Sequence, residues 1–212
     1  MINMSENTIK FPVVTTEMLK KSGANFDNIN DLIEQEKIVR VKRGHYLHKA
    51  ALQFPHKACF SAFKDALYCL ESAAYIFGYL KHEPPKVMIA ASKMESRKKY
   101  KSKVLPVKMM VRDEKYYHVG YSQIKFEGFT INVTDRERTL LDSIRHNKKM
   151  DPRIYGKIIT GYINDEHKNI DRLVKYASQL RLIKKVEILL QPWLGEEISN
   201  VLHAQGDNHE KN

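Results

Sequence analysis

The sequence predicts an α+β protein: an N-terminal winged helix-turn-helix, then a sheet-plus-helices domain with a C-terminal helical section. Three observations predict this fold class. Two helical patterns and a hairpin pattern fill the first fifty residues, β-branched and aromatic runs dominate residues 86–133, and helical periodicity resumes after Thr134. A linker marked by Pro55 divides the chain, so we expect two domains, residues 1–57 and 58–212.

Capping and turn residues define the N-terminal elements. We expect helices over 13–23 and 26–36 and hairpin strands over 38–41 and 45–48. Gly23 supplies a helix stop, Asn25 can cap the second helix, and Gly44 lies in the hairpin turn. Only residues 1–11 are available for a preceding helix, which Pro12 ends. This order of elements is typical of a winged helix-turn-helix.

The predicted second domain contains both helices and strands. We predict helices over 58–81, 135–146, 152–164, 169–180 and 184–204, and strands over 86–91, 104–111, 116–121, 123–126 and 129–133. The first of these helices is expected to be one buried spine, because Phe60, Phe63, Leu67 and Leu70 recur at helical spacing. The last helix is expected to kink or break near Pro192, and residues 205–212 to fray.

The chain is strongly basic. Lys and Arg number 36 against 25 Asp and Glu, a net charge of +11, and most of the surplus falls in residues 58–150. It is densest in residues 93–103, with six bases and one acid. This segment is either a solvated loop of self-repelling charges or a loop that contacts phosphate or a partner. Such a balance favours binding to polyanions, most often nucleic acid.

The composition disfavours membrane proteins, secreted proteins and disulfide-rich scaffolds. No apolar run approaches the ~20 residues of a membrane helix, and the polar N-terminus has no signal-peptide core. Two cysteines, Cys59 and Cys69, fit a reducing cytosol and packing in a core rather than a disulfide scaffold. We therefore expect a cytoplasmic protein with no membrane partner.

The second helix carries polar side chains opposite its apolar face. A step of 100° per residue places Asn28, Asp31 and Gln35 there, and these types can pair with adenine or cytosine in the major groove. Acidic residues on the same helix oppose phosphate, so flanking cations must hold the backbone. The predicted DNA-binding residues are Lys20, Lys21, Asn25, Asn28, Asp31, Gln35, Lys37, Arg40, Lys42 and Arg43. The alternative is a winged helix used only for protein contacts.

Catalytic and cofactor motifs are sparse. No phosphate-binding glycine loop or paired Cys-x-x-Cys occurs, and we expect no cofactor and no metal site. The rival enzyme hypothesis is a nuclease that uses Asp113, Glu114 and Lys115. These residues are expected in a hairpin turn, where a solvated charge cluster is the plainer interpretation.

A strand-to-helix junction near residue 135 admits two interpretations. Asp135 can cap the helix, and Arg138 and Asp142 are i, i+4 neighbours that can form a structural ion pair. Alternatively, Arg136 and Arg138 bind a phosphate or a target molecule.

Several segments resemble a known family. Val14-Thr-Thr-Glu-Met-Leu19 together with Ile38-Val-Arg-Val-Lys-Arg-Gly-His-Tyr46 is similar to the winged domain of AbiE-type antitoxins, from abortive-infection toxin–antitoxin systems of bacteria. Cys69-Leu-Glu-Ser-Ala-Ala74 and Val133-Thr-Asp-Arg-Glu-Arg-Thr-Leu-Leu-Asp142 resemble the second domain of that family. The resemblance covers about residues 13 to 195.

The resemblance implies a non-catalytic antitoxin that represses its own operon. It would bind inverted repeats of double-stranded DNA in its own promoter and counter a nucleotidyltransferase-like toxin in phage defence, with no direct complex required. The second domain would be needed for antitoxicity. Candidate residues for antitoxicity or anion binding are Arg97, Lys98, Lys99, Arg136 and Arg138.

Overall fold

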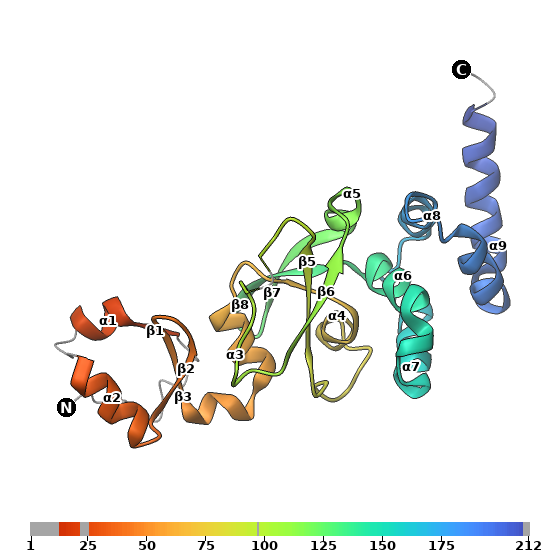
Figure 1. Ribbon diagram of the computed structural model, residues 1–212. Coiled ribbons are helices and arrows are strands. Elements are labelled where there is room, and N and C mark those ends of the chain that lie inside the picture. The colour runs from red at the N-terminus through yellow and green to blue at the C-terminus, as the bar shows by residue number, and fades with distance from the viewer. Residues whose placement is uncertain (1–12, 22–25, 97, 210–212) are drawn as a thin grey trace.

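The computed structural model describes residues 13–21, 26–96 and 98–209, and it is an α+β chain. Figure 1 shows a small N-terminal unit at one end, a mixed sheet in the middle and a group of helices at the other end. No helix in these ranges combines the length and apolar character that crossing a membrane requires.

The N-terminal unit packs two helices against a small antiparallel sheet. Its elements are β1 Val14–Thr15, α1 Thr16–Lys21, α2 Phe26–Glu34, β2 Ile38–Lys42 and β3 His45–His48. The strand order is β1-β3-β2, and Gly44 reverses the chain between β2 and β3 with a φ of +72°. The predicted helix within residues 1–11 and the predicted stop at Gly23 lie outside the described residues.

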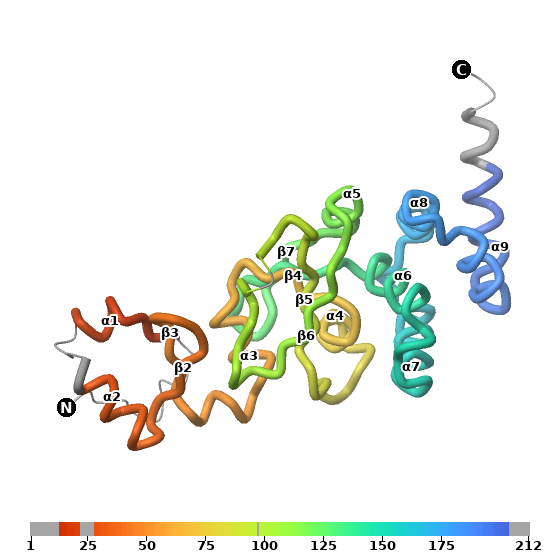
Figure 2. The backbone as a smooth tube through the Cα atoms, in the orientation of Figure 1, coloured from red at the N-terminus to blue at the C-terminus, as the bar shows by residue number. Residues whose placement is uncertain are grey.

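A five-stranded mixed sheet forms the centre of the molecule. Its elements in chain order are η2 Lys49–Gln53, α3 Pro55–Ala62, β4 Leu67–Tyr68, α4 Leu70–Ile76, β5 Val87–Ser92, β6 Val107–Arg112, α5 Glu114–Tyr117, β7 Tyr121–Phe126 and β8 Phe129–Thr134. The strand order is β6-β5-β4-β8-β7. Figure 2 traces the backbone through this part of the chain. The β5–β6 and β4–β8 pairs are parallel, whereas β4–β5 and β7–β8 are antiparallel.

Both faces of this sheet are covered, and β5 is buried along its whole length. Val87 and Ile89 pack in one cluster with Phe60 and Phe63 from α3 and the segment after it, whereas Met88 packs in a second cluster with residues of α4 and α7. Successive side chains of a strand point to opposite faces. A strand covered on both sides therefore carries an unbroken apolar run instead of an alternating one.

The predicted single helix over 58–81 is wrong. The chain forms α3, crosses the sheet as β4 and turns into α4. Leu70, at the start of α4, has a φ of +48°, which no helix interior allows. The predicted strand at 116–121 is also wrong, because α5 occupies its first residues, and the strand predicted at 104–111 begins only at Val107.

The remaining helices form a third group with its own core. They are α6 Arg136–His146, η3 Asn147–Lys149, α7 Pro152–Ile163, α8 Ile170–Gln179 and α9 Ile183–His209. The side chains of Asp135, Asp151 and Asn169 cap α6, α7 and α8 by accepting hydrogen bonds from backbone N–H groups. α9 runs as one helix to His209 with Pro192 inside it, so the helix is not broken there, and a kink at Pro192 stays a prediction. Residues 205–209 are helical where fraying was predicted, and residues 210–212 lie outside the described residues.

The N-terminal unit shares its packing with the central sheet. Val41 of β2 and Leu47 of β3 belong to the same buried cluster as Phe63 and Val87. The Val13 N–H also donates to Ser61 Oγ of α3 over 2.9 Å. The boundary predicted between residues 57 and 58 lies inside α3, where the chain is helical and mostly buried.

Candidate nucleic-acid interface

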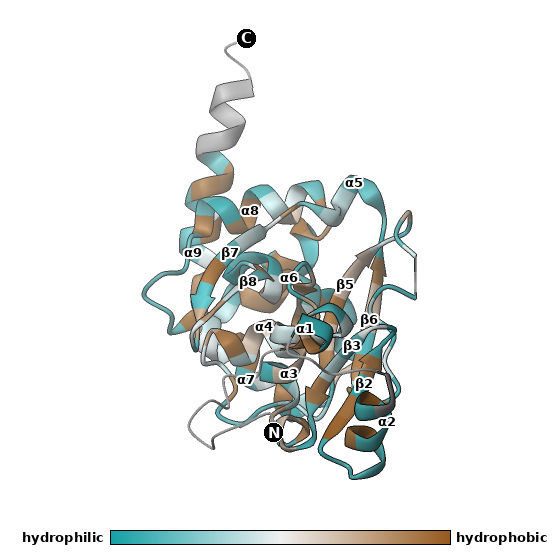
Figure 3. Cartoon of the chain, turned by 90° about the vertical axis from the view of Figure 1, so that its left-hand side faces the viewer, coloured by the Kyte–Doolittle hydropathy of each residue, from teal (hydrophilic) through white to brown (hydrophobic). Residues whose placement is uncertain are grey.

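The polar side of α2 lies at the free end of the N-terminal unit. Asn28 and Asp31 are exposed there, and Gln35 is exposed directly after the helix. The opposite side of α2 packs Ile29 against a small core with Leu19, Ile38 and Tyr46. Apolar and polar residues alternate along α2 in Figure 3, and in Figure 1 the helix lies away from the central sheet. We call Asn28, Asp31 and Gln35 the α2 outer face.

Exposed cations occur on α1, on and just before β2, and in the β2–β3 turn. Lys37 and Arg40 are exposed before and within β2, and Arg43 is exposed in the β2–β3 turn. Lys20 and Lys21 are exposed on α1, where Lys21 pairs with Glu17 over 2.9 Å. The predicted contact Asn25 lies outside the described residues.

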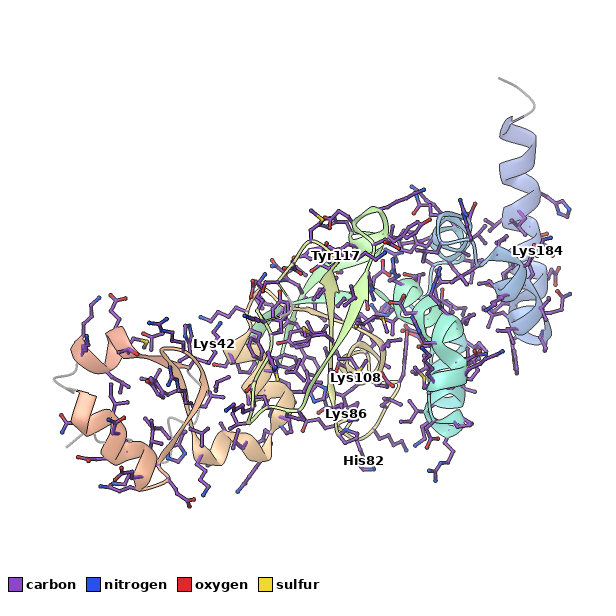
Figure 4. All side chains as sticks on the ribbon, viewed as in Figure 1. Lys42, His82, Lys86, Lys108, Tyr117 and Lys184 are labelled. Carbon is purple, nitrogen blue, oxygen red and sulfur yellow. The ribbon has the colours of Figure 1, made fainter. Side chains whose placement is uncertain are left out.

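Lys42 does not join these cations. Its ammonium lies over the ring of Phe63, 5.5 Å from the ring centroid, and its side chain is half-buried. Figure 4 shows Lys42 on the side of the N-terminal unit that faces the central sheet. A cation above an aromatic ring is stabilised by the ring's negative face. The prediction that Lys42 contacts DNA phosphate from the hairpin is therefore not supported by its position.

The acidic residues of this region are only partly neutralised. Lys49 pairs with Glu36, and its hydrogen bond and charge lower the pKa of that carboxyl group. Asp31 and Glu34 remain exposed on α2. A duplex bound at this face would therefore depend on cations of other elements for its phosphate contacts.

The Arg138 guanidinium is buried in an ion-pair network at the start of α6. Arg138 Nε donates to Asp142 Oδ1 over 3.0 Å, and Nη1 donates to the carbonyls of Tyr116 and Val119 over 2.9 and 3.0 Å. The side chain is only 3% exposed, and burial lowers its pKa. The predicted i, i+4 pair is confirmed. A residue that binds an anion from solution must face solvent, and Arg138 does not.

A second arginine in this network was not predicted. Arg112, at the end of β6, also pairs with Asp142, and its side chain is 5% exposed. The partners are thirty positions apart in the sequence, so no local spacing could indicate the contact. Arg138 packs directly against Gly120, where any larger residue would clash, because a Cβ there would lie 2.3 Å from Arg138 Cβ.

The other predicted anion-site residues are dispersed. Arg136 pairs with Asp165 over 2.7 Å and stacks on the Phe77 ring at 4.7 Å. Lys99 pairs with Asp65 and Glu95 over 2.6 and 2.7 Å. Lys98 is exposed, and Arg97 lies outside the described residues. Within the described part of the chain, the candidates do not converge on one exposed site.

The basic segment 93–103 is anchored to the body of the protein. Tyr100 is 1% exposed and packs on Phe63, and Leu105 just beyond the segment is also buried in the central core. The segment is therefore not a freely solvated loop, although several of its lysines face solvent.

The residues of the nuclease hypothesis are engaged in local pairs. Asp113 and Glu114 lie at the start of α5 rather than in a hairpin turn, and they contact Lys93 and Ser92 respectively. Among the described side chains, no three His, Cys, Asp or Glu residues gather closely enough to hold a metal ion. Nothing in this arrangement singles out a nuclease site.

A buried histidine links three elements of the central region. His56 Nε2 lies 2.8 Å from Ser72 Oγ, and Nδ1 lies 2.9 Å from Glu83 Oε1. Ser72 Oγ also accepts a hydrogen bond from the Met88 N–H over 2.8 Å. Burial lowers the pKa of His56 to about 4. Ser72 is completely buried, so this Ser–His–Glu arrangement has no path for a substrate and ties α3 and α4 to β5.

Comparison with known proteins shows a likeness in fold alone. No family model matches the chain, and no curated protein matches it. The chain is similar to the crystal structure of the RV2827C protein from Mycobacterium tuberculosis, with a TM-score of 0.56 and 14% identity over 82% of this chain and 71% of that one. A likeness at this identity shows a shared α+β architecture only.

Proposed function

We propose that residues 13–48 form the DNA-binding unit of a winged helix-turn-helix repressor. The observation that carries the proposal is the position of the α2 outer face, which is exposed at the free end of the molecule and not packed against the central sheet. Amide side chains presented on a short helix are suited to reading base edges in the major groove.

The arrangement around α2 supports this proposal. A β-α-α-β-β order with the strand order β1-β3-β2 is what a winged helix-turn-helix presents after its first helix. Arg40 and Arg43 are exposed on the hairpin, so this unit presents cations that suit phosphate contacts.

We extend the proposal to antitoxin action by the resemblance to AbiE-type antitoxins. The protein would repress its own promoter at inverted repeats and counter a nucleotidyltransferase-like toxin in the cytoplasm, without catalysis and with no direct complex required. Arg112 and Arg138 would then act by holding the second domain together, and exposed cations such as Lys98 are the better candidates for contact with a target.

Fluorescence anisotropy with the full chain tests the DNA-binding proposal. A labelled duplex carrying the upstream DNA of the gene is compared with a shuffled duplex of equal length over a salt series. We expect binding to the upstream duplex at least about 10³-fold tighter than to the shuffled one. Absence of binding to either duplex at low salt would instead indicate a module for protein contacts.

Two further measurements separate the remaining parts of the proposal. Co-expression with the toxin gene tests antitoxicity, and growth that is not restored would refute it. Incubation of purified protein with DNA and Mg²⁺ tests the non-catalytic assignment. Cleavage that disappears in Asp113→Ala would establish a nuclease instead.

A further inference from the structure

The basic segment between β5 and β6 contacts the same aromatic ring as the N-terminal hairpin. Tyr100 of the segment packs edge-to-face on Phe63 with 5.8 Å between ring centroids, and the Lys42 ammonium of β2 lies 5.5 Å from the Phe63 centroid. The exposed Arg43 of the hairpin turn follows directly after Lys42. Figure 1 shows the chain between β5 and β6 on the side of the sheet that faces the N-terminal unit. The segment is therefore a neighbour of the hairpin.

Residues 98–103 are anchored at two adjacent positions. Tyr100 is 1% exposed, and its hydroxyl group donates to the Asp65 carbonyl over 3.5 Å. Lys99 pairs with the carboxylates of Asp65 and Glu95 over 2.6 and 2.7 Å. These contacts hold the backbone of the segment in place, so a ligand that binds there does not have to order a mobile loop.

Three lysines of this segment remain open to solvent. Lys98, Lys101 and Lys103 are exposed, and in the part of the chain that the structure describes none of them forms an ion pair. Residues 98–103 contain no acidic residue and no exposed apolar one. We call Lys98, Lys101 and Lys103 the β5–β6 lysines.

This composition suits a nucleic-acid backbone better than a protein surface. Lysine is depleted at protein–protein interfaces, where aromatic residues are enriched. Its ammonium group is a point charge that can contact a phosphate without reading a base. A duplex carries one charge per ~1.7 Å of its axis, so it presents about six charges over the roughly 11 Å from Lys42 across Phe63 to the Tyr100 ring. One duplex can therefore contact the hairpin turn and the β5–β6 lysines together.

We propose that the β5–β6 lysines are a second phosphate-contact site for the duplex that the N-terminal unit binds. The inference rests on the DNA-binding proposal and extends the contacted surface from the hairpin onto the central region. Because contacts to phosphate carry no sequence information, this site adds affinity and leaves the preference for the upstream duplex unchanged.

Fluorescence anisotropy of the full chain over a salt series tests this site on the upstream and shuffled duplexes. The triple variant Lys98→Ala, Lys101→Ala, Lys103→Ala loses three phosphate contacts. Its slope of log K against log salt should be smaller by about 2.7, since each contact contributes about 0.9. Between 50 and 200 mM salt, native affinity should then fall about 40-fold more than the affinity of the variant, on both duplexes alike.

A second triple variant removes the same charge at the other end of the molecule. Lys175, Lys184 and Lys185 are exposed on α8 and α9, and Figure 4 shows Lys184 far from the N-terminal unit. Their replacement by alanine should leave the slope at its native value. Equal slopes in the two triple variants would overturn the proposal, because the effect would then come from net charge or be absent.

Hydroxyl-radical footprinting of the bound upstream duplex locates the contact. The variant of the β5–β6 lysines should lose protection of one patch of sugars and keep the rest, and an unchanged footprint would overturn the proposal. If that variant binds DNA like the native chain but no longer restores growth beside the toxin, the lysines contact a protein instead. A native chain that binds neither duplex would refute the DNA-binding proposal and this inference with it, whereas native binding that the variant fully retains would refute this site alone.

Discussion

Replacing both Arg40 and Arg43 by alanine should reduce the salt dependence of DNA binding. Both guanidinium groups are exposed on the β2–β3 hairpin. Removing one cation that binds a phosphate lowers the slope of log K against log salt by about 0.9, so the slope of the double variant should be smaller by about 1.8. Between 50 and 200 mM salt, native affinity should then fall about 12-fold more steeply than the affinity of the variant.

Lys42→Ala is the control for this experiment, because the Lys42 ammonium lies over Phe63 and not beside the α2 outer face. Its slope should equal that of the native protein. The measurement is fluorescence anisotropy at several salt concentrations on the upstream duplex and on a shuffled one. An unchanged slope in the Arg40/Arg43 variant, or an equally reduced slope in Lys42→Ala, would refute the assignment of phosphate contacts.

Three further variants test other parts of the structure. Asn28→Ala should weaken binding to the upstream duplex by about 1–3 kcal/mol and hardly affect the shuffled one, and equal weakening on both duplexes would argue against base reading. Asp142→Ala leaves Arg112 and Arg138 buried without a counter-charge and should lower the free energy of unfolding in urea by about 3–5 kcal/mol; a decrease below about 1 kcal/mol, as expected for an exposed pair, would contradict this. His56 has its folded pKa depressed to about 4, so the unfolded chain takes up a proton that the folded chain refuses, and stability is lost as the pH falls below about 6.5. Between pH 6.5 and 4, the free energy of unfolding of His56→Gln, measured in urea at each pH, should fall by about 3 kcal/mol less than that of the native chain. If the two free energies fall equally with pH, the assignment to His56 is refuted.

Local signals in the sequence predicted much of the fold. The hairpin around Gly44 and the cap Asp135 form as expected, because each depends on residues only a few positions apart. The segment that became β4 could not be predicted in this way. Leu67 and Tyr68 are buried on both faces of the sheet, so they lack the alternation that marks a strand and imitate the apolar spacing of a helix.

The candidate sites also contain residues that local patterns predict and residues that only tertiary contacts determine. The exposed positions of the α2 outer face followed from helical periodicity, because one side of an amphipathic helix must be polar. The position of Lys42 over Phe63 and the pairing of Arg112 with Asp142 depend on tertiary contacts between distant segments. Without those contacts, Arg138 has the sequence features of an available cation, although the fold buries it.

Val41 and Leu47 of the hairpin share one hydrophobic core with Phe63 and Val87 of the central region. The hairpin is therefore packed onto the central sheet. A ligand that displaced the hairpin would have to separate these side chains, so the N-terminal unit proposed to bind DNA and the central sheet cannot move independently at this contact. Deleting the first 57 residues would uncover apolar side chains of the remaining sheet and make the truncated protein prone to aggregation. The proposed functions of the N-terminal unit and of the rest of the chain are therefore better tested by point substitutions on the surface than by truncation.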